Sequence, residues 1–141
     1  MTEEQKELLL KDLCDRLPYG VKLNFNYIIT SPAILKGINK DFIECDIAAC
    51  ELEDVKPYLF PISSITKEQR NEFPFELSLL HAFINGYISL FEDEELSVDD
   101  IIRMMDCLNK NHIDYRGLIP LGLAIDCTNL NIYRLYEHND T

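Results

Sequence analysis

The sequence predicts an α+β fold, in which a small antiparallel sheet of about 3–5 strands packs against about 3–4 helices. Three observations carry this prediction. Apolar residues recur at helical spacing near the start of the chain, alternate with polar residues through residues 21–49, and return to helical spacing after residue 66. The length of 141 residues fits a single domain spanning residues 1–141.

The first helix is predicted over residues 3–16. Thr2 and Gln5 have the spacing of a capping box, in which each side chain bonds the backbone N–H of the other residue. Four leucines then recur at helical spacing: Leu8, Leu9, Leu13 and Leu17. Pro18 and Gly20 are expected to end the helix, because proline cannot continue it and glycine suits the turn that follows.

Three strands are predicted next, over residues 21–29, 33–38 and 42–49. The first shows the two-residue period of a half-buried strand. In the third, one alternating set is expected to face the core: Ile43, Cys45, Ile47 and Ala49. Short turns join the three strands, so we expect an antiparallel meander.

Residues 55–66 form the stretch around which the two halves of the chain are organised. Pro57 and Pro61 exclude a regular helix there and argue against a central strand. Most of the other residues are too apolar for a solvated linker: Val55, Tyr58, Leu59, Phe60, Ile62 and Ile65. We therefore expect an ordered, largely buried crossing segment.

The second half is predicted to be mostly helical. Thr66 and Gln69 repeat the capping-box spacing, so a short helix should begin at Lys67 and end by Pro74. Residues 75–91 carry an apolar stripe at helical spacing. A strand near their end is an alternative, and the acidic residues that follow, 92–95, are expected to form a solvated loop.

The most sharply patterned helix begins after Ser97, which is an N-cap supported by Asp100, and runs to about residue 109. One face is apolar and is expected to be core: Val98, Ile101, Ile102, Met105 and Leu108. A turn-rich exit is expected over residues 111–117. After it we expect a short helix or turn at 118–124, strands at 125–127 and 132–136, and a polar tail.

The chain is strongly acidic, with 25 Asp and Glu against 13 Lys and Arg and a formal net charge of −12. General binding to a nucleic-acid backbone needs clustered Lys and Arg side chains, which release the counterions of the phosphates. Binding to an anionic membrane also needs clustered positive charge. Neither partner is expected. The acidity permits a basic protein partner, or it simply keeps the fold soluble.

Compartment is indicated by three further observations. The N-terminus is acidic and amphipathic, so we expect no secretory signal. No apolar run approaches the ~20 residues that span a bilayer. The five cysteines form no C-x-x-C pair. Reduced, mostly buried thiols in a cytoplasm are the expectation.

Sequence motifs for catalysis and cofactors are weak. The three histidines are far apart and form no metal-binding pair, and the five glycines never cluster into a phosphate-binding loop. Asp41, Glu44 and Asp46 resemble half of a calcium loop, but the strand pattern explains them better. A Cys–His pair that meets only in space stays open. We expect no metal, no cofactor and no catalytic residue.

Two polar groups of residues are better candidates for binding. One comprises Tyr19 and Lys22, around Gly20, and the other comprises Tyr115 and Arg116, between Asp114 and Gly117. Each combines an aromatic ring with a cation, which suits stacking on a base or gripping a phosphate or carboxylate. Lys56 and Tyr58 are further candidates. The structural alternative is that these residues complete the core, cap carbonyls or pair with buried acids.

Three ordered blocks resemble one family: LPYGVK at residues 17–22, VKPYLFPISSIT at 55–66, and NHIDYRGLI at 111–119 followed by GLA at 122–124. This is a family of short uncharacterised proteins of gut Bacteroidetes and their phages and prophages. It commonly has Arg where Phe60 stands here, and often His or Phe where Asn111 and Ile113 stand. The family has no established activity, so the resemblance assigns no catalytic residue and implies a bacterial or phage cytoplasmic setting.

Three functions are open from the sequence. The first is a small non-enzymatic binding protein, plausibly phage-borne, that sequesters or modulates a host protein or small ligand, a host-defence antagonist among the candidates. The second is a module for a nucleotide-like ligand that uses Tyr19, Lys22, Tyr115 and Arg116. The third is an enzyme whose site is assembled from residues distant in sequence. The sequence leaves the oligomeric state open.

Overall fold

A computed structural model describes residues 1–25, 32–39, 41–84 and 97–133, and it confirms the α+β class. The α-helices among these residues are α1 (Glu3–Arg16), α2 (Lys67–Asn71), α3 (Leu77–Ile84) and α4 (Val98–Lys110). The strands are β1 (Lys22–Phe25), β2 (Ala33–Ile38), β3 (Ile43–Cys45), β4 (Ala49–Cys50), β5 (Val55–Pro61), β6 (Ile113–Asp114) and β7 (Ile125–Asp126). Short 3-10 helices are η1 (Leu17–Tyr19), η2 (Leu52–Asp54) and η3 (Ile62–Ser64).

The sheet is larger than expected and mixed rather than purely antiparallel. Its strands run in the order β4-β3-β2-β1-β5-β6, and β7 also pairs with β5. The predicted meander is confirmed, because β1, β2 and β3 pair antiparallel in sequence order. The parallel pairs β5–β6 and β5–β7 come from segments more than fifty residues downstream.

The expectation for residues 55–66 was partly wrong, because β5 is a strand in the interior of the sheet. It pairs with β1 on one stretch and with β6 and β7 further along. Residues next to Pro57 and Pro61 make hydrogen bonds between strands, although the prolines cannot donate them. For example, the N–H of Phe60 donates to the carbonyl of His112 at 2.8 Å. The burial prediction holds, since Val55, Tyr58, Leu59 and Ile65 are buried.

The predicted third strand is split into two. Beyond β3 the chain reverses, and the N–H of Cys45 donates to the carbonyl of Ala48 at 2.9 Å to close a tight turn into β4. The reversal interrupts the alternation of faces. Ile43 is buried as expected, whereas Ile47 and Ala49 are exposed.

Two further expectations need correction in the second half. The turn-rich exit contains strand β6, and Ile132 and Tyr133 lie in a turn rather than a strand. Of the short helix or turn expected at residues 118–124, the structure has turns. Residues 85–96, with the alternative strand and the acidic loop, lie outside the described residues, as does the tail from residue 134. The five cysteines are free, but Cys127 alone among them is buried, against the expectation of mostly buried thiols.

The helix starts follow the predicted capping. Capping boxes are present at Thr2 with Gln5 and at Thr66 with Gln69, and the Ser97 hydroxyl accepts from the backbone N–H of Asp100 at 3.1 Å. Because these caps satisfy backbone N–H groups that the first turn leaves without partners, local sequence sets where each helix begins.

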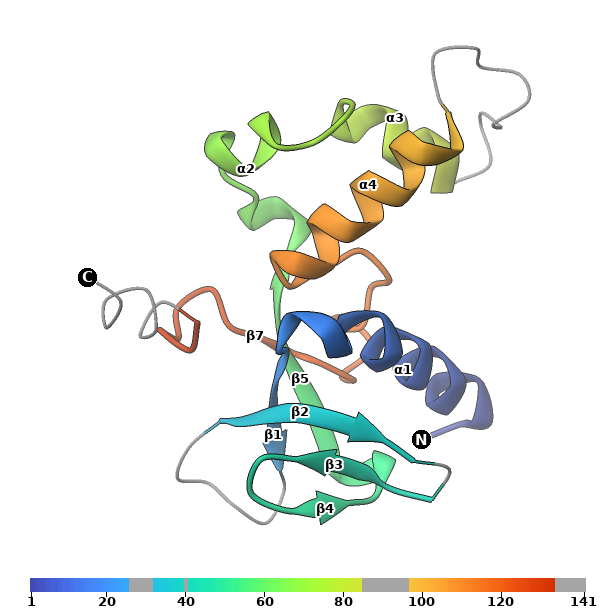
Figure 1. Ribbon diagram of the computed structural model, residues 1–141, viewed down its shortest axis with the longest axis vertical. Helices are drawn as coiled ribbons and strands as arrows, with labels where there is room; N and C mark the ends of the chain where they lie inside the picture. The colour runs from blue at the N-terminus through green and yellow to red at the C-terminus, as the bar shows by residue number, and fades with distance from the viewer. Residues whose placement is uncertain (26–31, 40, 85–96, 134–141) are drawn as a thin grey trace.

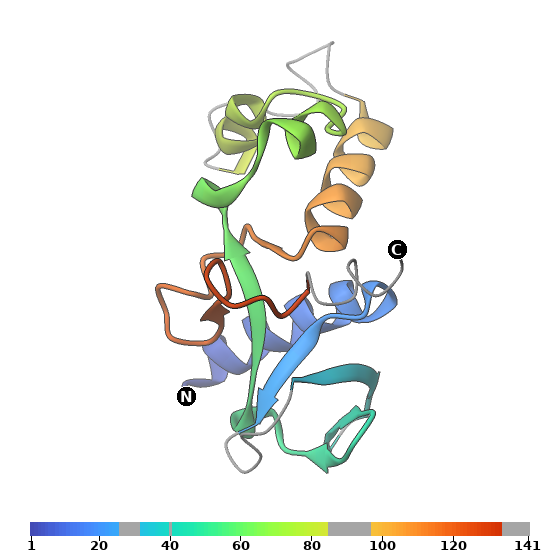
Figure 2. The same cartoon turned by 90° about the vertical axis from the view of Figure 1, so that its left-hand side faces the viewer.

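Two apolar clusters lie at opposite ends of β5. The sheet-side cluster packs α1 against β1, β2 and the first part of β5, with Leu9, Leu13, Leu23 and Leu59 at its centre. The helix-side cluster gathers residues of α3, α4, β6 and the segment after η3, and Phe60 of β5 packs against it: Ile65, Leu80, Met104, Leu108 and Ile113. Figures 1 and 2 show α1 lying beside the sheet and β5 running from the sheet to the group of α2, α3 and α4.

Helix α4 buries part of the face that the sequence predicts and exposes the rest. Leu108, expected to be core, is fully buried in the helix-side cluster together with Met104. Val98 and Ile102, also expected to be core, lie nearer the start of the helix and are 60% and 52% exposed. In the described part of the chain, no helix is long and apolar enough to cross a membrane.

Candidate functional site

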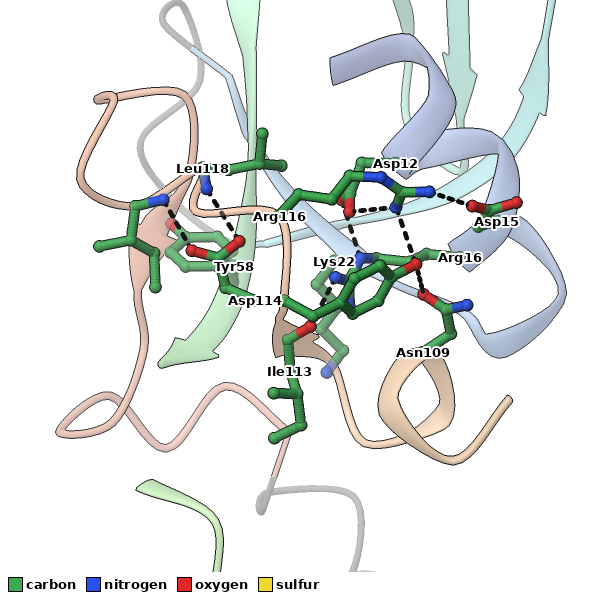
Figure 3. Close-up of polar contacts among 12 residues, drawn as sticks. Asp12, Asp15, Arg16, Lys22, Tyr58, Asn109, Ile113, Asp114, Arg116 and Leu118 are labelled. Atoms are coloured by element: carbon green, nitrogen blue, oxygen red, sulfur yellow. Dashed lines mark hydrogen bonds and ion pairs between the residues drawn. The ribbon is translucent and has the colours of Figure 1, made fainter. Parts of the chain in front are cut away.

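A cluster of charged side chains, buried at Asp12 and Arg16, joins α1 to the segment after β6 (Figure 3). Arg16 Nε donates to Asp12 Oδ2 at 2.8 Å, and Arg116 Nη1 donates to Asp12 Oδ1 at 2.9 Å. Arg116 Nη2 also bonds the carboxylate of Asp15. Asp12 and Asp15 are three residues apart on α1, so both can reach one guanidinium. The cluster holds two cations and two anions and is balanced in charge.

Arg16, like Asp12, is fully buried in this cluster. Its side chain is 0% exposed, and Nη2 donates to the carbonyl of Ile113 in β6 at 2.6 Å. Its remaining nitrogen, Nη1, has no hydrogen-bond partner in the described residues. A buried charge is tolerated only when it is paired and hydrogen-bonded. Arg16 therefore ties α1 to β6 and is not presented to a ligand.

Tyr115 and Arg116, two of the predicted binding residues, are part of the same arrangement. The Tyr115 hydroxyl donates to Asn109 Oδ1 and accepts from Arg116 Nη1, both at 2.8 Å. The guanidinium carbons of Arg116 and Arg16 lie 4.7 and 5.2 Å from the centre of its ring. Burial raises the pKa of Tyr115. These contacts connect α1, α4 and β6, as the structural alternative anticipates.

The segment after β6 is fixed by Asp114. Its two carboxylate oxygens accept the backbone N–H groups of Leu118 and Ile119, each at 2.9 Å. A carboxylate that accepts backbone N–H groups organises a turn much as an N-cap organises a helix. Asp114 is buried, so its role in this structure is to shape the loop that carries Arg116.

Lys22 and Tyr58 lie in a second group of contacts, around Tyr133. The Tyr133 hydroxyl donates to the carbonyl of Tyr58 at 2.8 Å and accepts from the backbone N–H of Lys22 at 2.9 Å. Lys22 Nζ donates to the carbonyl of Ile132 at 2.8 Å, and burial lowers the pKa of Lys22. These bonds hold residues 132–133 against β1 and β5. Lys56, the remaining candidate, lies exposed on β5.

A polar cleft of about 520 Å³ lies beside this second group, between the end of β5, α2 and the end of α4. Its lining includes Phe60, Lys110, His112 and Tyr133. The rings of His112 and Tyr133 are stacked with their centres 3.8 Å apart. Burial, and then the charges of Arg16 and Lys22, lowers the pKa of His112 to about 4, so the imidazole is neutral at physiological pH.

A groove of about 380 Å³ lies between the end of α1 with η1 and the outer face of α4. Its lining is mainly apolar or aromatic: Cys14, Pro18, Tyr19, Ile101, Ile102, Met105 and Tyr115, with Asp15, Asp106 and Asn109. In Figure 1, α1 and α4 approach each other at their C-terminal ends and diverge toward their N-terminal ends. Exposed Val98 extends the apolar stripe one turn beyond the groove.

The charge of this groove is negative. Its charged lining residues, among those described, are Asp15 and Asp106. Burial, and then the charge of Asp106, raises the pKa of Tyr19. The groove therefore combines apolar side chains and two phenol rings with two carboxylates, of which Asp15 is bonded to Arg116 and Asp106 is exposed.

The structure brings some of the predicted residues together and separates others. Tyr19 and Tyr115 line the groove, and Arg116 lies beside it on Asp12 and Asp15. Lys22 and Tyr58 do not line the groove and instead bond residues 132 and 133, in the group around Tyr133.

Sequence reasoning missed the acids of α1 and Asp106. A signal was present for the former, because Asp12 and Arg16 fall on the same helical face as Leu9 and Leu13.

Within the described residues, no group of three or more His, Cys, Asp or Glu side chains could hold a metal ion. No protein-family model, curated protein or solved structure matches this chain.

Proposed function

We propose that this protein is a non-enzymatic binding protein and that its partner, another protein, docks in the groove between α1–η1 and α4. The observation that carries the proposal is the exposed apolar stripe of α4. Val98 and Ile102 are more than half exposed although they stand at core spacing in a helix. Exposed apolar surface rimmed by polar residues is typical of interaction sites.

A partner that covers the stripe would gain apolar burial that the fold forgoes. Burying an isoleucine or valine side chain is worth about 1.5–3 kcal/mol, and exposure forgoes that stabilisation. Docking over Ile101, Ile102 and Met105 would recover it. The groove also has fixed walls, because Tyr115 is hydrogen-bonded to both Asn109 of α4 and Arg116. A rigid apolar groove lowers the entropic cost of binding.

The charged groups beside the groove are engaged in holding the fold. Arg16, Arg116, Asp12 and Asp114 each make hydrogen bonds to other described residues. This supports binding over catalysis. The resemblance to proteins of gut Bacteroidetes and their phages supports a bacterial cytoplasm as the setting and a host protein, a defence protein among the candidates, as the partner.

A site for a nucleotide-like ligand would need Tyr19, Lys22, Tyr115 and Arg116 around one cavity. Tyr19 and Tyr115 line the groove, but Lys22 bonds the carbonyl of Ile132 and Arg116 bonds two carboxylates of α1. The charged lining of the groove is acidic, which disfavours phosphate. No observation favours this alternative over a protein partner.

The proposal is tested by quantitative capture of host proteins on three forms of the protein. Wild type is compared with Ile102→Ser, which removes the exposed isoleucine of the groove, and with Leu121→Ser, which removes a leucine of similar exposure (49%) elsewhere. A partner should be retained by wild type and Leu121→Ser and lost from Ile102→Ser. Equal retention by all three forms would overturn the groove as the binding site.

A further inference from the structure

We infer that the occupant of the groove is an amphipathic helix of the partner that carries lysine or arginine beside its apolar face. This inference rests on the proposed function and adds the shape and the charge of the occupant. It follows from three features. Apolar residues form a line along α4, the charge around them is negative, and that charge disfavours a second copy of this chain as the occupant.

The shape of the groove suits a helix. Val98, Ile101, Ile102 and Met105 stand at positions i, i+3, i+4 and i+7 of α4, which is the ridge that one helix presents to another. The opposite wall is η1, with Pro18 and Tyr19. An amphipathic helix laid into such a channel buries its own apolar residues at the same spacing, as in known helix-in-groove complexes.

The charge of the groove selects a cationic helix. Asp106 is exposed on α4 and lines the groove, and Asp15 lines the facing wall with its side chain 48% exposed. Arg103, the arginine of α4, is paired with Asp100 at 2.7 Å and does not line the groove. A lysine or arginine flanking the apolar face of the bound helix would therefore meet Asp106 on α4 and, on the facing wall, the half-exposed Asp15 carboxylate, which Arg116 also binds.

The same charges disfavour a second copy of this chain. A symmetric dimer through α4 would bring the same acidic face of both copies, Asp106 included, into one interface. Each copy also carries a net charge of −12. Like charges brought together at an interface oppose association, so the complementary surface belongs to a different, basic protein.

Selection from a library of displayed amphipathic helices tests the inference. The probe is a set of peptides of roughly 18 residues, long enough to be helical in water. Each has Leu, Ile, Met or Phe on one face and random Lys, Arg, Glu, Asp or Gln on the flanks. Wild type should enrich helices with basic flanks. Enrichment of acidic or neutral flanks, or of non-helical peptides, would overturn the inference.

Titration of the best enriched peptide against variants then locates the contact. Asp106→Asn should weaken binding about 2- to 5-fold at low ionic strength and less at high salt. Ile102→Ser should weaken it about tenfold or more. Asp99→Asn, an exposed acid of α4 outside the groove, and Leu121→Ser are the matched controls and should bind like wild type.

The outcomes separate the two proposals. If Glu- and Lys-flanked helices bind equally and both are lost with Ile102→Ser, docking in the groove stands and the cationic occupant is wrong. If the Lys-flanked helix binds Ile102→Ser as well as wild type, it binds acidic surface in general and both proposals fail for this groove. If sedimentation shows a dimer that Ile102→Ser dissociates, a second copy occupies the groove.

Discussion

Arg16 and His112 carry buried polar groups that the fold must accommodate. Arg16 bonds Asp12 and the carbonyl of Ile113, yet its Nη1 has no partner among the described residues. His112 has a positive φ of 59° and a buried Nδ1 that is also without a partner there. Burial lowers the pKa of His112, as do the positive charges of Arg16 and Lys22, and the ring of Tyr133 stacks on the imidazole.

Replacing Arg16 should be far more damaging than replacing an exposed arginine. Arg16→Met removes the donor to Ile113 and leaves part of the Asp12 carboxylate without its partner, so we expect a loss of about 3 kcal/mol in the free energy of unfolding. Arg103→Met, in an exposed pair with Asp100, should cost under about 0.5 kcal/mol. Urea denaturation of both variants measures the difference, and equal costs would contradict a structural role for Arg16.

The lowered pKa of His112 predicts how stability depends on pH. The ring titrates at about 4 in the folded protein and near 6.5 in the unfolded chain. Between these values the unfolded state binds more protons, so stability rises with pH. The contribution is complete above pH 6.5 and is lost as the pH falls toward 4, by up to about 3 kcal/mol.

His112→Asn isolates this effect, because asparagine tolerates the left-handed backbone conformation at this position. We expect the unfolding free energy of wild type to fall more steeply than that of the variant between about pH 6.5 and about pH 4.5. Urea denaturation at several pH values measures both slopes. Parallel slopes would show that His112 titrates normally in the folded protein.

The elements differ in how far the sequence could predict them. Local signals were sufficient where local bonds define the element: the capping residues Thr2, Thr66 and Ser97 place three helix starts correctly. Strand β5 was missed because its pairing comes from distant segments, β6 and β7. A proline weakens a strand locally but does not prevent pairing by the residues around it.

The candidate site shows the same limit. Tyr19 and Tyr115 were chosen for their residue types, and both line the groove. The pairing of Arg116 with Asp12 spans 104 positions of the chain, so no local pattern contains it. The apolar periodicity of α4 is real, but periodicity identifies an apolar face without saying whether protein or a partner covers it.

The orientation of α4 can be checked by truncating one residue on each face. Met104→Ala should cost about 2–5 kcal/mol, because it leaves a cavity in the helix-side cluster. Ile102→Ala should cost under about 1 kcal/mol, since alanine favours the helix and the isoleucine is half exposed. Thermal unfolding followed by circular dichroism compares them. The reverse ranking would show that Ile102, and not Met104, packs in the core.

At the scale of the whole molecule, β5 links the two apolar clusters. Its residues Val55 and Leu59 belong to the sheet-side cluster, and Phe60 packs on the helix-side cluster. The Arg16–Ile113 and Arg116–Asp12 bonds cross between the same two regions. Covalent continuity through a buried strand and buried ionic contacts should make the stability of one cluster depend on the other.

We therefore predict a single cooperative unfolding transition. Leu59→Ala perturbs the sheet-side cluster and Leu108→Ala the helix-side cluster, and each should lower the free energy of unfolding by about 2–5 kcal/mol. Far-UV circular dichroism and tyrosine fluorescence should report the same midpoint for each variant, because a two-state transition has no partly folded population. If Leu108→Ala lowered one midpoint and left the other unchanged, the clusters would be separate folding units. The groove requires that the two clusters fold together, because α1 belongs to one cluster and α4 to the other. Its two walls keep a fixed spacing only while both clusters are folded.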